Sequence, residues 1–134
     1  MTDPIDDISI PFHNEIYEGL GEIHGRLRLG HGNLVIEYMA KDAVFGLLRG
    51  RVRELRIPLI DIEDIELHNG WFRKRITIRS NSITSFADFP GAESGVLVLR
   101  IKRRDIARAQ VGVSRLRLLQ SEQKLKALDE WGES

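Results

Sequence analysis

The sequence predicts a mainly β fold: an antiparallel sandwich or barrel of about seven strands, capped by a C-terminal α-helix. Short runs of alternating apolar and polar residues fill the chain from Glu22 to Ile101, and this is the period of half-buried strands. Turn residues separate these runs. After Ile101 the apolar residues recur every three or four positions, which indicates a helix.

The first part of the chain predicts an edge strand and a hairpin. Residues 1–20 are polar and irregular, but ISIPF fits an edge strand, where the missing backbone donor of Pro11 is tolerated. From residue 22 to residue 29, isoleucine and leucine share one face, and charged residues and histidine share the other. The turn GHG at residues 30–32 leads to a second strand, which carries Leu34, Ile36 and Tyr38.

The middle of the chain predicts a third strand, a bend and another hairpin. Apolar residues at positions 52–57 mark the third strand, which Pro58 ends or bends. The next apolar residues are unevenly spaced, which predicts a short turn or bulge near residues 63–64 and then a strand. Asn69-Gly70 predicts a type I′ turn, because both residues tolerate a positive φ.

Two further strands and the helix complete the predicted fold. SFADF at residues 85–89 is a short sixth strand. VLVLRI at residues 96–101 is a seventh, and its nearly continuous apolar character predicts a central position or cover on both faces. A helical pattern then runs from Asp105 to about Trp131, although Gly112 lowers its helix propensity. Its first turns are enough to cap the sandwich, through Ile106, Ala109, Val113 and Leu116.

Length and composition limit the classes of protein to which this chain can belong. A chain of 134 residues fits one domain, expected at residues 21–120, between the N-terminal segment 1–20 and a helical extension at 121–134. There is no cysteine, so disulfides and thiolate metal sites are excluded. The 20 lysine and arginine residues balance 20 aspartate and glutamate residues, so no global basic field attracts nucleic acid.

The expected location is the cytoplasm. The N-terminus carries acidic residues where a signal peptide has basic ones. The longest apolar stretches are far shorter than the roughly 20 residues that span a bilayer. The absence of cysteine also fits a reducing compartment.

Four sequence segments follow one another in the order expected for a strand-rich domain that ends in a helix. They are GRLRLGHGNLVIEY, RELRIPLIDIEDIEL, RITIRSNS and FPGAESGVLVLRIKRRDIARA. With IPL-x-DI after the third strand and PG…G-x-L-x-L-x-I-x-R before the helix, they resemble a bacterial pleckstrin-homology-like (PH-like) domain, kin to GRAM domains, over residues 20–120. The resemblance implies two near-orthogonal antiparallel sheets with a helix plugging one end. It also implies a non-catalytic domain that binds lipids, peptides or proteins.

We therefore expect a non-catalytic binding module that has no cofactor and mediates protein–protein contact or self-association. The resemblance to PH domains makes lipid binding a function to consider. The PH domains that bind phosphoinositides hold the lipid head group with basic residues around the first hairpin. Here Arg26 and Arg28 lie nearby, but the turn itself lacks the basic residues. The sequence therefore argues against specific phosphoinositide binding.

The first candidate site is the connection before the third strand, where polar residues are expected. An apolar tip beside a basic stem can insert into a membrane interface, so peripheral membrane binding through residues 44–56 is the alternative function. The same residues can instead clasp an acidic partner, fold over the barrel or seal an oligomer. The candidates are Phe45, Leu47, Leu48, Arg49 and Arg51.

The second candidate is the part of the helix that the sandwich does not need. An isolated amphipathic extension is marginal in water, so it should bury its apolar stripe against a second copy or a protein partner. Otherwise the helix bends near Gly112 or Ser121 and folds back, or it frays. The candidate residues for association are Leu118, Leu119, Leu125 and Leu128.

The remaining motifs favour structural roles. Trp71 and Phe72 stand beside three basic residues, but a single such patch favours cross-strand aromatic packing over nucleic-acid binding. No histidine pair has the spacing of a helical metal pair, so no metal site is expected. Nucleophile-elbow and dinucleotide-binding motifs are absent, so no catalytic residues and no enzyme are predicted. The histidines read as surface or turn residues: His13, His24, His31 and His68.

Overall fold

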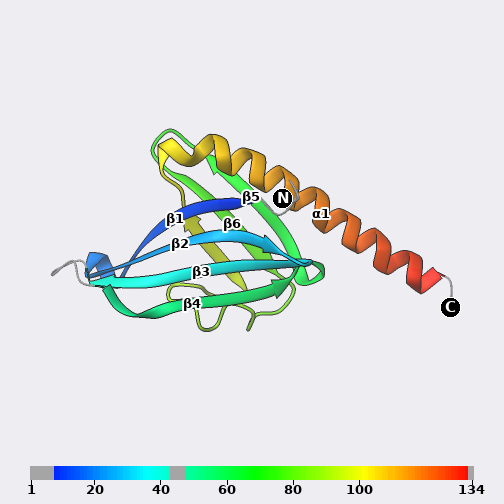
Figure 1. Cartoon of the computed structure of the whole chain (residues 1–134), viewed down its shortest axis with the longest axis horizontal. Helices are drawn as coiled ribbons and strands as arrows, with labels where there is room; N and C mark the ends of the chain where they lie inside the picture. The colour runs from blue at the N-terminus through cyan, green and yellow to red at the C-terminus, as the bar shows by residue number, and fades with distance from the viewer. Residues whose placement is uncertain (1–7, 43–47, 133–134) are drawn as a thin grey trace, which may run out of the picture.

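The structure confirms a mainly β fold, with seven antiparallel strands in two sheets followed by a C-terminal helix (Figure 1). The computed structural model describes residues 8–42 and 48–132. The first sheet contains β1 (Ser9–Ile16), β2 (Gly21–Gly30), β3 (Asn33–Asp42) and β4 (Leu48–Pro58), in that order. The second contains β5 (Ile62–Asn69), β6 (Lys74–Ser80) and β7 (Val96–Arg100). Three short 3₁₀ turns, η2 (Tyr17–Gly19), η3 (Leu59–Asp61) and η4 (Arg103–Asp105), and the helix α1 (Ile106–Gly132) complete the chain.

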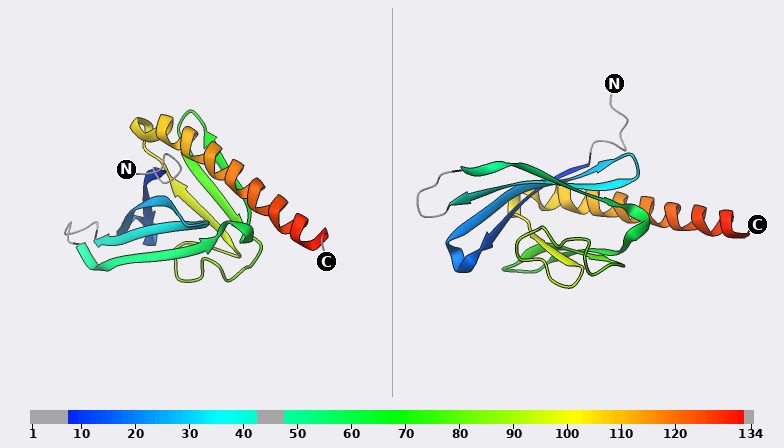
Figure 2. Two further views of the ribbon diagram at one scale, coloured as in Figure 1. Left: turned by 45° about the vertical axis from the view of Figure 1, so that its right-hand side comes forward. Right: turned by 90° about the horizontal axis from the view of Figure 1, so that it is seen from below.

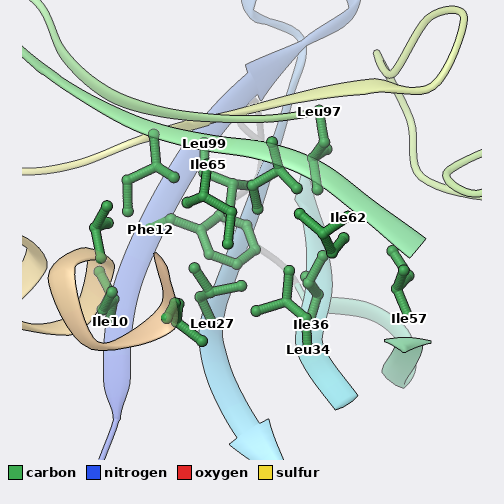
Figure 3. Close-up of a cluster of buried hydrophobic side chains, with 14 of the residues drawn as sticks. Ile10, Phe12, Leu27, Leu34, Ile36, Ile57, Ile62, Ile65, Leu97 and Leu99 are labelled. Carbon is green, nitrogen blue, oxygen red and sulfur yellow. The ribbon is translucent and has the colours of Figure 1, made fainter. Parts of the chain in front are cut away.

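The core lies between the two sheets and is closed on one side by α1 (Figure 2). One face of each strand supplies it, because side chains alternate along a strand. The helix packs against β5, η3 and β1 through the buried residues Ala109, Val113 and Leu116. Figure 3 shows the interlocking side chains of both sheets, among them Ile10, Phe12, Leu27, Leu34, Ile36, Ile57, Ile62, Ile65, Leu97 and Leu99.

The two sheets form a sandwich and are not joined into a barrel by the strand pairs that the structure describes. Where β1 approaches β7, the side chain of Asn14 connects the two strands by hydrogen bonds. Asn14 Nδ2 donates a hydrogen bond to the Val98 carbonyl at 2.8 Å, and the Arg100 amide donates to Asn14 Oδ1 at 2.9 Å. The asparagine amide thus satisfies backbone groups that β7 would otherwise offer to another strand.

Several local predictions are confirmed. The expected edge strand is β1, and Pro11 lies on it at the margin of the first sheet. The expected bend before β5 is the turn η3, and a register shift follows between Ile62 and Asp64. Between Glu22 and Ile101 the structure forms six strands with no helix longer than a single 3₁₀ turn among its described residues.

The predicted type I′ turn at Asn69-Gly70 is wrong. Asn69 pairs with Lys74, which leaves a four-residue loop, and neither Asn69 nor Gly70 has a positive φ. The register is set by the apolar residues of β5 and β6 that must face the core, and it leaves four residues between the paired Asn69 and Lys74, whereas a type I′ turn leaves two. A two-residue turn with a positive φ at both positions joins β2 to β3 instead, at His31 (45°) and Gly32 (79°).

The predicted strand SFADF is also wrong. Residues 84–92 form successive turns, with hydrogen bonds from the Ala87 amide to the Thr84 carbonyl and from the Phe89 amide to the Phe86 carbonyl. Phe86 and Phe89 are nevertheless buried. A turn brings residues three apart to the same side, so these two rings can enter the core without a strand. The seventh strand is β1 instead.

The predicted central position of VLVLRI is wrong as well. The strand β7 lies at the edge of the second sheet, and its burial alternates. Leu97 and Leu99 face the core, whereas Val98 is partly exposed. Apolar residues on the outer face are tolerated here, because single exposed apolar side chains are normal on protein surfaces.

The helix α1 continues through Gly112 and Ser121 without a break. Gly112 lies where the helix crosses β1, and a Cβ atom there would lie 2.6 Å from Ile10 Cδ1. The glycine therefore lowers helix propensity but permits a close approach of helix and strand.

Candidate functional site

The side chains of the first candidate site are not among those that the structure describes. Phe45 and Leu47 belong to the segment 43–47. Leu48, Arg49 and Arg51 lie on β4, and only their backbone is described. The neighbouring Val52 is exposed and lies where the pairing of β3 with β4 shifts register. Membrane insertion or partner binding by this connection therefore stays a prediction.

The second candidate site is the outward side of α1. The helix extends well past the sandwich (Figure 1), and its side away from the core carries exposed apolar residues. Leu118 and Leu125 are seven residues apart, as are Val111 and Leu118, so all three share one stripe. We call Val111, Leu118, Leu125 and Leu128 the outer helix face; their exposed fractions lie between 57% and 67%.

Leu119 does not belong to this face, although the sequence prediction included it. Its side chain is partly buried and packs against the core. A helix turns by about 100° per residue, so Leu119 points toward the side on which Leu116 and Gln120 are buried. Val111 was missed by the prediction, but its seven-residue spacing from Leu118 was the signal that could have found it.

The prediction of cross-strand packing for Trp71 and Phe72 is wrong. Both side chains lie in the loop between β5 and β6 and are 81% and 91% exposed. They contact each other edge to face, with ring centroids 6.1 Å apart. The four-residue loop carries them beyond the paired strands, so no neighbouring strand can cover them. We call this pair the aromatic tip.

Basic residues surround the aromatic tip. Arg75 pairs with Arg100 across β6 and β7. The Ile101 amide donates a hydrogen bond to the Lys74 carbonyl at 2.8 Å, so the start of β6 lies beside the end of β7. Like charges directly opposite each other on neighbouring strands are unfavourable. The basic residues gathered here create a local positive field, although the net charge of the whole chain is zero. This basic end comprises Arg73, Lys74, Arg75 and Arg100, which line a groove with Phe72, and also Lys102, Arg103 and Arg104, which follow β7 in the chain.

Few acidic groups neutralise the basic end. In the part of the chain that the structure describes, its one ion pair joins Arg104 to Asp105 at 3.9 Å. Lys74 Nζ instead donates hydrogen bonds to Asn69 Oδ1 and the Gly70 carbonyl. A shallow groove of about 350 Å³ lies beside Phe72 and is lined by Arg73, Arg75 and Arg100 among others.

A third arrangement, which sequence reasoning missed, joins β1 and β2. His13 lies directly opposite His24, and Glu22 precedes His24 by two residues on the same face of β2. Glu22 Oε2 lies 3.1 Å from His24 Nε2, and Glu22 Oε1 lies 3.5 Å from His13 Nε2. The two imidazole rings are 4.5 Å apart. Only the strand register, which no spacing rule for helices captures, could reveal this cluster.

The electrostatics of this cluster centre on Glu22. A hydrogen bond from His24 is the main cause that lowers the pKa of Glu22 below its ordinary value; partial desolvation opposes it, and His13 adds a smaller lowering effect. All three side chains are partly exposed. His13 and His24 also line a surface groove of about 410 Å³, together with Arg26, Met39, Lys102 and other residues.

No protein-family model, curated protein or solved structure matches this chain. None of the helices in the described part of the chain has the length and apolar character needed to cross a bilayer.

Proposed function

We propose that this protein is a non-catalytic binding module of PH-like architecture that self-associates through its outer helix face. The observation that carries the proposal is the position of Val111, Leu118 and Leu125. They repeat every seven residues on the side of α1 that faces away from the core. Two helices that pack along their length have apolar residues at two positions of every seven. Val111, Leu118 and Leu125 occupy the first of these positions, and Leu128 occupies the second.

The charges of α1 favour an antiparallel pair. From residue 106 to residue 120 the helix has three arginines and no acidic residue. From residue 121 to residue 130 it carries Glu122, Asp129 and Glu130, with two lysines between them. Antiparallel packing sets the basic half of one helix beside the acidic part of the other. It also sets Val111 of one copy against Leu125 of the other, with the two copies of Leu118 facing each other.

Association should depend on the outer helix face alone. We expect the full chain, of 15.3 kDa, to sediment as a dimer, and Leu118→Lys with Leu125→Lys to sediment as a monomer. Two lysines cannot be buried in such an interface without a large desolvation cost. Analytical ultracentrifugation over a range of protein concentrations measures both.

The control for this experiment carries the same change of charge. Leu20→Lys with Ile83→Lys also replaces two exposed apolar residues with lysine, but at positions away from α1, and should remain a dimer. A full chain that is monomeric at every concentration would refute self-association, and so would a lysine variant of unchanged size.

A second candidate function is contact with an anionic membrane surface, and the exposure of the aromatic tip favours it. Trp and Phe insert at the boundary of head groups and acyl chains, while adjacent Lys and Arg residues attract anionic lipids. The tip combines both in one place, since Trp71 and Phe72 project from the basic end. The membrane alternative predicted from the sequence used another segment, residues 44–56.

Replacing the aromatic tip should weaken vesicle binding. We expect the unmutated protein to co-sediment with vesicles that contain phosphatidylserine, and Trp71→Ser with Phe72→Ser to bind at least about tenfold more weakly, because the apolar area is lost. Added salt should also release the protein. Ile83→Ser with Leu20→Ser removes two exposed apolar residues elsewhere and should bind normally. Equal binding by both double variants, or none by the unmutated protein, would exclude this function.

A further inference from the structure

We propose that His13, Glu22 and His24 form a binding site for a divalent transition-metal cation, with zinc as the best fit. The donor set carries the first part of the argument. Two imidazoles and one carboxylate are a ligand combination that zinc uses in proteins, with a further position left for water or another ligand. Calcium and magnesium prefer oxygen ligands and fit this set poorly.

The distances between the donor atoms carry the second part. Each of the three side chains offers one ligand atom, and these three atoms all lie within 4.8 Å of one another. Around a tetrahedral zinc ion with bonds of about 2.0–2.1 Å, neighbouring donors are roughly 3.3–3.4 Å apart. Each oxygen of the Glu22 carboxylate lies near this distance from one histidine: Oε2 is 3.1 Å from His24 Nε2, and Oε1 is 3.5 Å from His13 Nε2.

The backbone already holds the three side chains close together. His13 and His24 are direct cross-strand neighbours in the ladder of β1 and β2, and Glu22 is two residues from His24 on the same face. In that register Glu22 stands between Glu15 on one side and Lys41 on the other, so these flanking charges offset each other. Little rearrangement is needed for the three ligands to converge.

The groove beside the two histidines leaves room for a further ligand. Its lining includes the basic side chains of Arg26, Lys102 and Arg104, the acidic side chains of Glu37 and Asp105, and the thioether of Met39. The basic side chains outnumber the acidic ones by one, and this excess favours an anion or a hydroxide over a neutral ligand at the open position of the metal. The site is thus expected to bind a cation through the protein and a small anionic group from the groove.

Titration of the full chain with zinc tests the proposal. The protein is used without a histidine tag, at about pH 7.5, because the affinity of a metal for histidine and carboxylate ligands falls when they are protonated. Calorimetry should show one zinc ion bound per chain, and magnesium should give no binding. His24→Gln and Glu22→Gln should each weaken zinc binding by at least about tenfold, since even the loss of an outer hydrogen-bond partner has that effect on a metal site.

The chain offers a matched control on β5. Glu66 and His68 repeat the spacing of Glu22 and His24, with His68 Nε2 3.5 Å from Glu66 Oε2, but they lack the second histidine of the cluster. His68→Gln should therefore leave zinc binding unchanged. Cobalt gives a second measurement, because its visible absorption bands should appear with the unmutated protein and with His68→Gln but fade with His24→Gln.

Two outcomes would overturn the proposal. One is the absence of saturable zinc binding by the unmutated protein. The other is equal zinc affinity of His24→Gln and His68→Gln. Thermal unfolding and circular dichroism without metal establish that each variant is folded; if His24→Gln is not, Glu22→Gln decides the question, because it keeps the shape of the side chain.

Discussion

Replacing Gly25 with alanine is expected to lower the free energy of unfolding by about 3 kcal/mol, at the upper end of the cost of overpacking a core. A Cβ atom at this position would clash with the Glu37 carbonyl oxygen and lie 2.6 Å from Phe12 Cζ. The carbonyl belongs to the backbone of β3 and cannot turn aside as a flexible side chain can. Either the strand pair or the Phe12 ring must move.

Gly30→Ala is the control for this substitution. Gly30 lies on the same strand, and its added Cβ would meet only Val35 Cγ2 among nearby atoms, at 3.4 Å. The free energy of unfolding should then change by less than about 1 kcal/mol. Urea denaturation of both variants measures the difference. Equal stability of the two variants would mean that β3 yields to the added methyl group without cost.

Leu116→Ala is expected to have a similarly large effect, about 3 kcal/mol of lost stability, because it leaves a cavity where α1 packs on the sandwich. The Leu116 side chain is fully buried together with Ala109 and Val113. Leu118→Ala, two residues further along the same helix, removes the same atoms from an exposed position. It should alter the stability of the monomer by less than about 0.5 kcal/mol.

The comparison of these two leucines is made at low protein concentration, so that association does not add to the stability of the unmutated chain. Denaturant unfolding then reports the monomer alone. At high concentration, Leu118→Ala should become destabilising if the outer helix face forms the dimer. A large loss of stability at low concentration for Leu118→Ala would place its side chain within the core instead.

The three proposed surfaces lie on different elements, so the variants of one surface serve as controls for the other two. The outer helix face belongs to α1, the aromatic tip to the loop between β5 and β6, and the histidine cluster to β1 and β2. Lys102 is the point of contact between two of them, since it belongs to the basic end and also lines the groove beside the histidines. Changes at the helix should therefore leave both zinc and vesicle binding intact.

The sequence alone determined the fold class, most strand positions and the helix. Ile23 and Leu27 on one strand, and Ile36 on the next, follow the period-two pattern that places them in the core. Such patterns are local, because a strand with one buried face must alternate wherever its neighbours lie. The bulge near residues 63–64 and the edge position of Pro11 were predictable for the same reason, since uneven spacing and a missing donor are local properties.

Only the tertiary structure decided which residues meet. The loop after Asn69 follows from the register of β5 with β6, and the exposure of Trp71 follows from that loop. His13 faces His24 because β1 pairs antiparallel with β2 in one particular register. Register and neighbours are set by the sum of many distant burial contacts, none of which is written in the spacing of nearby residues. A site that draws its groups from different strands therefore becomes visible only when the sheet is assembled.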